Sequence, residues 1–374
     1  MIEIDLNARI LSEDHNVFIV RPGNAYGLFG EITQRASLIL ELPGLDLTPG
    51  VRPDDADLRR RVNRSRALRA WYNGTQDATD KPPAGLDAYS ATEGGASAAQ
   101  LVGLVRTFFE KMRPGDLVVV PPKSYMEDAW IGEISGPAYD VQPERVARLF
   151  GEEILPGRAV RWIARIPKRD LPFSILDALQ KPSPAFLVER SQRAVFYKIA
   201  YGNYSISDFY SARFEVTEAD FDTLDDVLLQ AFFNFVAANT KAVTENGDQA
   251  IVRGFADAAF VDSGEFTPHL QTNINSPGDI TLVSRVITPL VASVLFLLAV
   301  QVGPAAKGEA EADTLVLKNS KADVQDPCTA AVFKSSTQII KLLDLDEWPK
   351  ACERAQEVAR KTGLKSPAKV ERRQ

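Results

Sequence analysis

Residues 115–141, GDLVVVPPKSYMEDAWIGEISGPAYDV, contain two short apolar runs, Leu117–Val120 and Trp130–Ile134. A Pro-Pro-Lys-Ser-Tyr loop separates the runs, and a Gly-Pro pair closes the second. Apolar runs of about four or five residues bounded by turn-forming residues are typical of β-strands. The stretch therefore predicts a β-hairpin. Three aromatic residues lie at its turn and edges: Tyr125, Trp130 and Tyr139.

The composition is that of an acidic protein with enough apolar residues for sizeable cores. The chain has 374 residues, of which 45% are hydrophobic, and this length favours two domains. Its 43 basic and 50 acidic residues give a net charge of −7. Non-specific coating of nucleic acid depends on neutralising phosphates, so this balance argues against it. A local basic patch is still compatible with the composition.

Cysteine usage and the first residues favour a cytoplasmic location. Cys328 and Cys352 are too few for a disulfide framework or a four-ligand zinc site. Residues 1–15 mix acidic and apolar side chains, without the basic segment and apolar core of a signal peptide. We therefore expect a reducing, intracellular environment.

The first half of the chain alternates short strands with helices. Strands are expected at Val17–Val20, Leu38–Leu42 and Ala159–Ile166. A helix is expected at residues 54–72, where three aspartates near the start suit the helix dipole. A second is expected at residues 96–112, because their apolar side chains recur at helical spacing. We therefore predict an α+β fold for this half.

The second half differs in character and is expected to form its own domain. The Lys181–Pro184 stretch is a candidate boundary, which gives domains of residues 1–180 and 185–374. Residues 286–302, VITPLVASVLFLLAVQV, carry no charge over 17 positions. A bilayer-spanning helix needs about 20 apolar residues, and Pro289 further weakens the case for one. Two interpretations stay open for this strongly apolar helix: insertion in the inner membrane, and burial in the core of a mixed α/β domain.

No catalytic motif is present in the sequence. The patterns HExxH, GxSxG and GxxxxGK[ST] are absent, and the histidines His15 and His269 lie far apart. We assign no catalytic residue, metal ligand or cofactor. The Gly-rich loop at residues 23–30 either cradles a phosphate or only permits turns. Asn24 and Tyr26 in this loop are candidate contacts to a base or nucleotide.

An arginine cluster is the strongest charge feature. Arg60, Arg61 and Arg64 should project together from the helix at residues 54–72, because residues at i, i+3 and i+4 share a face. Two interpretations stay open: a ridge that contacts phosphates, and a solvated face paired with the aspartates of the first turn. The cluster comprises six arginines: Arg59, Arg60, Arg61, Arg64, Arg66 and Arg69. The candidate contacts to nucleic acid among them are Arg59, Arg60, Arg61 and Arg64.

The aromatic residues of the hairpin also have two interpretations. Tyr125 and Trp130 are candidates for stacking on a splayed base, an interaction worth roughly 1–3 kcal/mol for each base. The alternative is core packing, because Trp130 begins an apolar run and Trp162 lies within another.

Three stretches occur in an order that is typical of one known family. They are Val17–Gly23 (VFIVRPG), the hairpin, and residues 159–179 (AVRWIARIPKRDLPFSILDAL). Together they resemble the N-terminal domain of Mrr-type restriction-system proteins. The resemblance implies a small PUA/EVE-like β-barrel decorated with helices, a class that reads modified or flipped bases. It also implies that the hairpin supplies two barrel strands and a loop at the edge of a pocket.

The second half departs from that family, whose members usually continue into a metal-dependent nuclease domain. We therefore expect a sensor and effector protein of a bacterial antiphage or restriction system. Its first domain would bind nucleic acid, a modified base or a nucleotide, and its second would act as effector or bind partner proteins or further copies. Two alternatives stay open: a restriction nuclease component with an unrecognised active site, and an adaptor without a nucleic-acid ligand.

Overall fold

The computed structural model describes residues 2–74, 80–179, 183–218, 221–273, 278–322 and 326–372. The chain forms two compact units, Asp14–Ala200 and Met1–Glu13 with Tyr201–Gln374. Both units combine helices and strands, so the mixed α+β fold class is confirmed. The division differs from the predicted boundary near residues 181–184. The chain passes between the units at residues 13–14 and again at residues 200–201.

The unit Asp14–Ala200 contains a seven-stranded sheet in the order β4-β8-β6-β5-β3-β9, with β7 also paired to β8. Strands β5 and β6 pair antiparallel with Val120 opposite Trp130, which confirms the predicted hairpin. The strands are β3 (Val17–Val20), β4 (Ser37–Ile39), β5 (Leu117–Val120), β6 (Asp128–Ile134), β7 (Gln142–Arg145), β8 (Ile154–Pro167) and β9 (Ala185–Leu187).

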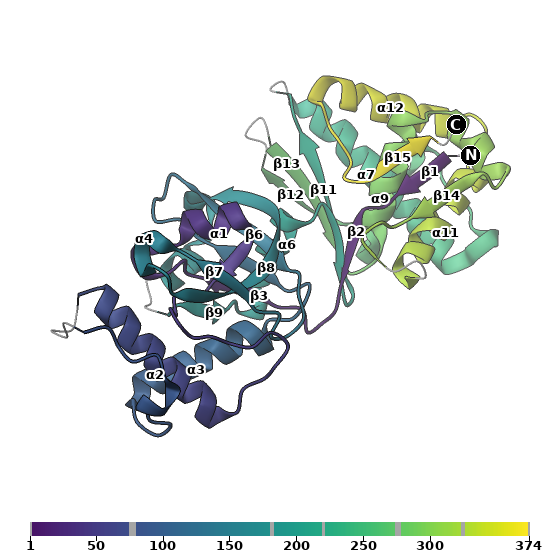
Figure 1. The fold of residues 1–374 in the computed structure, drawn as a ribbon. Helices are drawn as coiled ribbons and strands as arrows, with labels where there is room; N and C mark the ends of the chain where they lie inside the picture. Colours follow the sequence, from purple (N-terminus) through teal and green to yellow (C-terminus); the bar gives the residue numbers. More distant parts are fainter. Residues whose placement is uncertain are drawn as a thin grey trace. The chain divides into compact units, whose positions relative to one another are not determined.

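The long strand β8 gives this sheet its curvature. Its second half pairs with β6, whereas its first half pairs with β4 on one side and β7 on the other. Gly157 of β8 lies between β4 and β7, where a Cβ atom would come within 2.5 Å of Ser37 Oγ and 2.7 Å of Glu144 Cγ. Glycine therefore lets both strands approach β8, and the sheet curls as a half-barrel (Figure 1).

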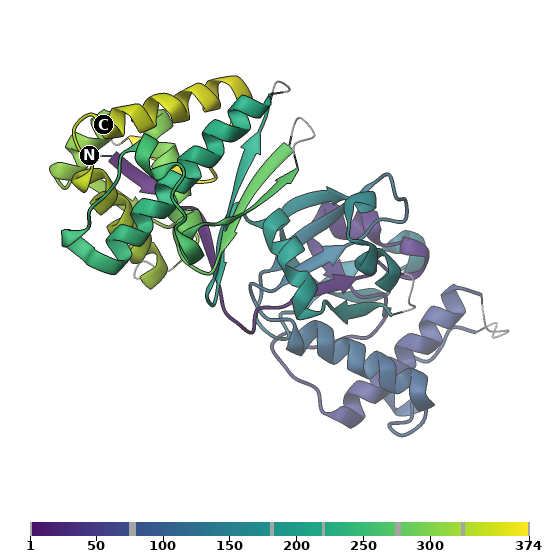
Figure 2. The ribbon, with the colours of Figure 1, turned by 180° about the vertical axis from the view of Figure 1, so that it is seen from behind.

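Two long helices of this unit lie side by side, as Figures 1 and 2 show. Helix α2 (Asp55–Tyr72) begins at Asp54, whose carboxylate accepts the backbone N–H of Asp57. Helix α3 (Gly95–Arg106) continues as a π-helical turn, Thr107–Lys111. Both follow the predicted helices closely. The shorter helices are α1 (Phe29–Arg35), α4 (Ala147–Phe150), α5 (Phe173–Ala178) and α6 (Arg193–Ala200).

The second unit is built around two sheets that both contain N-terminal residues. Strand β1 pairs parallel with β14 and antiparallel with β15, so the first and last strands of the chain are neighbours (Figure 1). Strand β2 pairs parallel with β10 at one edge of a sheet ordered β12-β13-β11-β10-β2. The strands are β1 (Ile2–Asp5), β2 (Ala8–Leu11), β10 (Asn203–Ile206), β11 (Phe209–Val216), β12 (His269–Asn273), β13 (Gly278–Ser284), β14 (Leu315–Lys318) and β15 (Lys369–Arg372).

The charge-free run of residues 286–302 contains helix α9 (Thr288–Gln301). Every side chain from Thr288 to Ala299 is buried, in a core shared with β11, β13 and the helices around it. Within the described residues, no helix combines the length and apolarity needed to cross a membrane. The other helices of this unit are α7 (Thr223–Asn246), α8 (Phe255–Ala258), α10 (Ala305–Glu311), α11 (Pro327–Leu342) and α12 (Glu347–Thr362).

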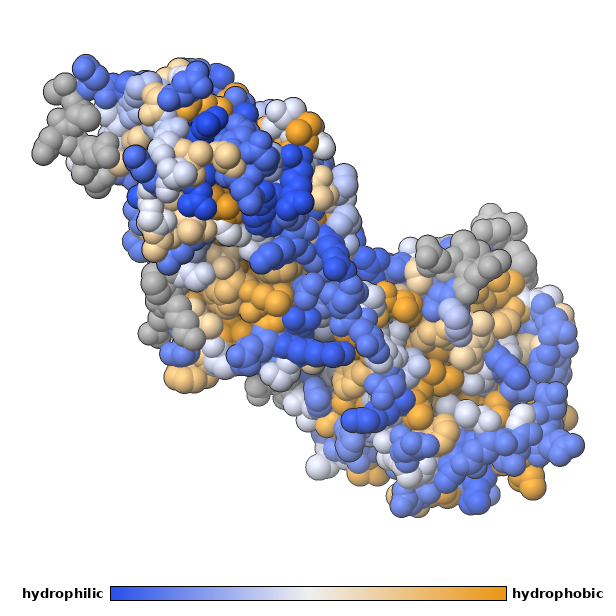
Figure 3. Space-filling view, turned by 90° about the horizontal axis from the view of Figure 1, so that it is seen from below, coloured by the Kyte–Doolittle hydropathy of each residue, from blue (hydrophilic) through white to orange (hydrophobic). Residues whose placement is uncertain are grey.

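The two cores account for most of the large apolar side chains. On the face drawn in Figure 3, hydrophilic side chains cover most of the surface and apolar side chains form smaller areas between them. Among the described residues, the most exposed large apolar side chains are Phe260, Ile251 and Phe173.

Candidate functional site

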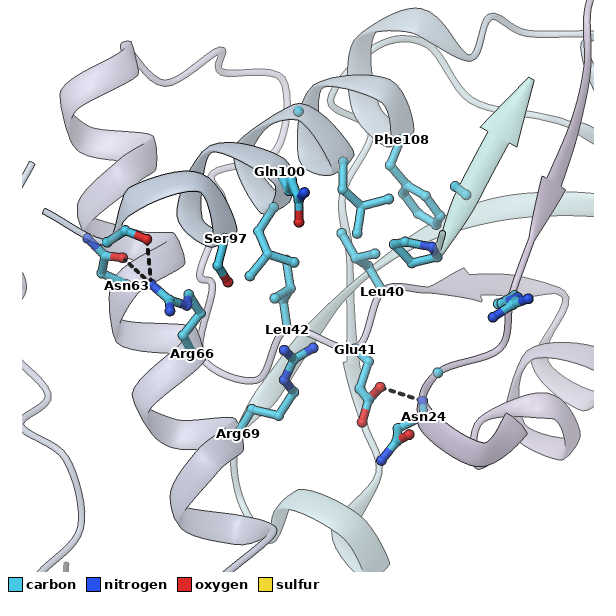
Figure 4. A pocket seen from close by; sticks show the side chains of 18 of the residues that line it. Asn24, Leu40, Glu41, Leu42, Asn63, Arg66, Arg69, Ser97, Gln100 and Phe108 are labelled. Atoms are coloured by element: carbon cyan, nitrogen blue, oxygen red, sulfur yellow. Dashed lines mark hydrogen bonds between the residues drawn. The ribbon is translucent and has the colours of Figure 1, made fainter. Parts of the chain in front are cut away.

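The unit Asp14–Ala200 contains a large cleft of about 1490 Å³. Helices α2 and α3 form one wall, and the other is formed by β3, the residues after β4, and the short helix η1 (Asn24–Tyr26) (Figure 4). Ligand pockets for small molecules usually have about 300–1,000 Å³. The cleft is therefore large enough for a ligand bigger than one small molecule.

The floor of the cleft is apolar. Leu40 and Leu42 come from the segment that follows β4, and both side chains are buried. The other side of the floor is formed by helix α3 and the π-helical turn. Their apolar side chains recur at helical spacing and therefore share one helix face. The α3-side residues of the floor are Leu101, Leu104 and Phe108. Leu104 and Phe108 are buried, so the half-buried Leu101 offers the apolar face that a ligand can reach.

The rim of the cleft is cationic. Four basic side chains and two carboxylates are found among its described lining residues, whereas the whole chain has an excess of acidic groups. A concave surface in which one sign of charge predominates concentrates ligands of the opposite sign. The cleft thus favours an anionic ligand. Its charged lining residues are Arg21, Arg66, Arg69, Lys111, Glu41 and Glu93.

Arg66 and Arg69 lie on the side of α2 that faces the cleft (Figure 4). They are three residues apart and so share a helix face. Arg66 Nη1 donates to Asn63 Oδ1 at 3.3 Å and to the Gly94 carbonyl at 3.4 Å. The Arg69 side chain makes no hydrogen bond or ion pair within the part of the chain that the structure describes. Its guanidinium is therefore available to a ligand.

Glu41 is the acidic group opposite Arg69 in the cleft (Figure 4). Its Oε2 atom accepts the backbone N–H of Asn24 at 2.6 Å, which ties the carboxylate to η1. Burial raises the pKa of Glu41, and the Asn24 N–H and the charge of Arg69 oppose that rise. The cleft thus holds a partly desolvated acceptor group beside a cation.

The η1 loop has a strained backbone at the edge of the cleft. Ala25 and Tyr26 have φ angles of 49° and 63°, a region that non-glycine residues rarely adopt. Gly23 has φ 75°, and a Cβ atom there would lie 3.2 Å from Leu28 Cδ1 and 3.3 Å from Glu41 Oε2. Consecutive strained residues are frequent at ligand sites. The loop places Asn24 and Tyr26 in the lining of the cleft.

A buried lysine connects this loop to the hairpin. Lys168 Nζ lies 5.1 Å from the ring centroid of Tyr26 and 5.0 Å from that of Tyr125. It donates to the carbonyl oxygens of Pro122 and Lys123 at 2.8 and 3.1 Å. Burial lowers the pKa of Lys168, and the nearby charge of Arg21 lowers it further. The ammonium group thus fixes the hairpin loop beside η1.

The four arginines selected from the sequence do not line the cleft. Arg61 forms an ion pair with Asp57 at 2.8 Å and donates to the carbonyl of Asp46. Arg64 donates to the carbonyl of Gly44 at 2.8 Å. The predicted projecting ridge of Arg60, Arg61 and Arg64 is therefore wrong in its geometry, because two of the three side chains bind their own chain. Arg59 is half-buried and Arg60 is exposed.

The aromatic candidates separate into three environments. Tyr125 is about half exposed and flanks Lys168. Trp130 is half-buried, outside the cleft, and packs edge-on against Trp162 with ring centroids 5.5 Å apart. Tyr139 is buried and stacks on Phe109.

Several residues of the cleft were not selected from the sequence, although some left a signal there. Glu41 interrupts the apolar run Leu38–Leu42, where a lone carboxylate indicates a special environment. Arg66 and Arg69 belong to the arginine cluster, but the run alone does not tell which helix face meets the rest of the unit. Tyr89 left no such signal, and burial raises its pKa.

We compared the chain with protein-family models, curated proteins and solved structures, and none of the three comparisons found a match. Within the described residues, no group of three or more His, Cys, Asp or Glu side chains is placed to hold a metal ion together.

Proposed function

We propose that the unit Asp14–Ala200 binds a single-stranded segment of nucleic acid in the cleft between α2, α3 and η1. The observation that carries the proposal is the combination of a cationic rim with an apolar floor in one large concavity. Proteins that bind single strands combine basic side chains for the phosphates with flat apolar or aromatic surfaces for the bases. The volume of about 1490 Å³ favours several linked nucleotides over one free nucleotide.

The residues divide naturally between the two parts of such a ligand. Arg66 and Arg69 would contact phosphates, since guanidinium groups bind phosphate oxygens in a bidentate manner. The floor at the half-buried Leu101 would receive a base, and the half-buried Tyr26 would cover its edge. Lys111 and Arg21 would extend the charged rim towards neighbouring phosphates.

The biological role in this proposal comes from the resemblance to Mrr-type proteins and not from the cleft. We propose that the unit is the PUA/EVE-like sensor part of a bacterial antiphage or restriction system, and that the second unit acts on a partner. The curled sheet of the first unit is compatible with that fold class. The apolar helix α9 would then form part of the core of the second unit and support its partner-binding surface.

Two matched double variants on one helix test the binding site. Arg66→Gln with Arg69→Gln removes two charges from the cleft, whereas Arg59→Gln with Arg60→Gln removes two charges from α2 outside it. Affinity for a fluorescently labelled single-stranded oligonucleotide of mixed sequence is measured by anisotropy at several salt concentrations. We expect the first pair to weaken binding at least tenfold. The slope of log affinity against log salt should fall by about 1.4, at roughly 0.7 for each phosphate that the protein no longer neutralises.

The control pair should leave both the affinity and the slope close to those of the unmodified protein. Equal effects of the two pairs would place the binding surface elsewhere on α2. No measurable binding by the unmodified protein would refute the proposal and favour an adaptor without a nucleic-acid ligand. A free nucleotide that competes as well as the oligonucleotide would show that the ligand is a single nucleotide.

A further inference from the structure

We propose that Glu41 reads the edge of a bound base and makes the cleft selective for guanine. This inference rests on the proposed function, since it assigns a specificity to the same cleft. It starts from a feature that phosphate binding leaves unexplained. A cleft that only attracts phosphates gains nothing from a carboxylate beside Arg69, yet Glu41 lies there.

The environment of Glu41 fixes the position of its carboxylate. The backbone N–H of Asn24 donates to Oε2 at 2.6 Å, and Gly23 leaves the space that this atom occupies. The adjacent segment is also held, because Leu40 N–H donates to the Pro156 carbonyl at 3.0 Å. A functional group whose position is fixed by its neighbours binds with less loss of conformational entropy. Glu41 is therefore prearranged to meet a ligand.

The carboxylate still has most of its capacity to accept hydrogen bonds. An ionised carboxylate offers about four lone-pair positions and no donor. Among the described residues, Asn24 provides the one hydrogen bond found for this group. The cleft wall thus presents a carboxylate whose Oε2 accepts one hydrogen bond, from Asn24, and whose Oε1 accepts none within the described residues. Arg69 faces the same space, and its positive charge opposes the burial-driven rise in the pKa of Glu41.

Guanine is the common base that satisfies such a group. It carries two adjacent donors, N1–H and N2–H₂, which match the two oxygens of a carboxylate. Adenine, cytosine and thymine each place an acceptor beside their donor on the same edge, and that acceptor would face a negatively charged oxygen. A site built to pair with a donor strongly rejects an analogue that lacks it, because a buried polar group is left unpaired.

The experiment uses heptanucleotides of thymidine with one central base, so that every ligand carries the same phosphates. The central base is guanine, hypoxanthine, which lacks the N2 amino group, adenine or thymine. Dissociation constants of the full chain are measured near pH 7.5 by anisotropy. We expect guanine to bind about tenfold or more tightly than adenine or thymine, with hypoxanthine between them.

The variant Glu41→Gln should abolish this preference, so that all four ligands bind with similar affinity. Loss of the negative charge beside Arg69 should strengthen phosphate binding for every ligand alike, so the ratio of the affinities is the quantity compared. Glutamine retains an acceptor for the Asn24 N–H, so the variant should fold, and thermal melting checks this. Glu93→Gln is the matched control, because Glu93 lines the same cleft but is exposed. It should keep the guanine preference.

The outcomes separate this inference from the function on which it rests. If all four ligands bind the unmodified protein equally and Arg66 and Arg69 are required, the strand-binding function stands and the role of Glu41 is refuted. A preference for adenine would equally refute it, since it would indicate a protonated Glu41 or another reading group. If no ligand binds, the proposed function itself fails. The comparison of ligands on the unmodified protein needs no variant, so a folding defect cannot hide the answer.

Discussion

The guanidinium carbon of Arg165 lies 3.7 Å from the centroid of the Trp130 ring. The two residues face each other across the antiparallel strands β6 and β8, so they form a direct cross-strand pair. A cation over an aromatic face is worth about 0.5–1 kcal/mol at an exposed site. One face of the Trp130 ring is therefore covered by this chain's own arginine.

Replacement of Trp130 by alanine should destabilise the unit without weakening ligand binding in the cleft. Truncation of a fully buried Trp costs about 3–5 kcal/mol, so this half-buried side chain should cost about 2 kcal/mol. Urea-induced unfolding and oligonucleotide anisotropy measure the two quantities separately. Arg165→Ala should cost less than about 1 kcal/mol. A tenfold loss of affinity with unchanged stability would instead mean that Trp130 touches the ligand.

Replacement of Arg158 should strongly lower the free energy of unfolding of this unit. Its buried guanidinium donates to the carbonyls of Phe108, Met112, Gly136 and Pro137, at 2.6–3.2 Å. Burial lowers the pKa of Arg158 to about 10, so the group is still charged at neutral pH. These hydrogen bonds hold the end of the π-helical turn against the segment after β6.

The variant Arg158→Met fills a similar volume but leaves those carbonyls without a donor. Each unsatisfied buried polar group costs about 1–3 kcal/mol, so the free energy of unfolding should fall by about 4 kcal/mol or more. Chemical denaturation measures this free energy. Arg169→Met, at a largely exposed position, should change stability by less than about 0.5 kcal/mol. Similar small losses for both variants would show that water replaces the guanidinium.

The helices and strands that depend on a local side-chain pattern were predicted well from the sequence. The hairpin follows from two apolar runs around a proline-rich turn, and α2 follows from Asp54 and the buried stripe of Leu58, Val62 and Leu68. Such features depend on residues that are close in sequence. Their boundaries agree with the structure to within a few residues.

Long-range pairing could not be predicted in the same way. The pairing of β1 with β14 brings Ile2 opposite Leu315, and no local pattern contains this information. The same limit applies to the arginine cluster. Arg61 pairs with Asp57, which lies one helical turn away. Arg64 donates to the carbonyl of Gly44, which only the folded chain brings close to it. Which face of α2 lines the cleft depends on where α3 packs.

Helix α9 should tolerate no charge within its buried run. Leu295 is fully buried, so Leu295→Ala should cost about 2–5 kcal/mol through weaker packing and a residual cavity. Leu295→Lys with Leu297→Lys should prevent folding of this unit, because neither ammonium has a partner there. Circular dichroism during urea unfolding measures the stability of each variant, and solubility after expression shows whether the double-lysine variant folds. Leu345→Ala, at a position 76% exposed, is the control and should be nearly neutral. A folded, soluble double-lysine variant would mean that α9 is not packed as in this structure.

The guanine preference should fall as the pH is lowered. Burial raises the pKa of Glu41 above that of an ordinary glutamate, so the carboxylate is protonated at a higher pH than usual. The ionised form is the one that accepts both guanine donors, and it predominates above the raised pKa. Protonation below it turns one acceptor into a donor and removes the match.

The ratio of the affinities for the guanine and thymine heptanucleotides, measured from pH 8 to pH 5, tests this titration. The ratio should fall towards one at the acidic end. Phosphate contacts cancel in the ratio, because the two ligands carry the same phosphates. The other ionisable groups that line the cleft are Glu93, the phenols Tyr26 and Tyr89, and the basic residues Arg21, Arg66, Arg69 and Lys111. Glu93→Gln should therefore leave the curve unchanged, whereas Glu41→Gln should give a ratio near one at every pH. A guanine preference that is independent of pH in the unmodified protein would show that Glu41 does not read the base.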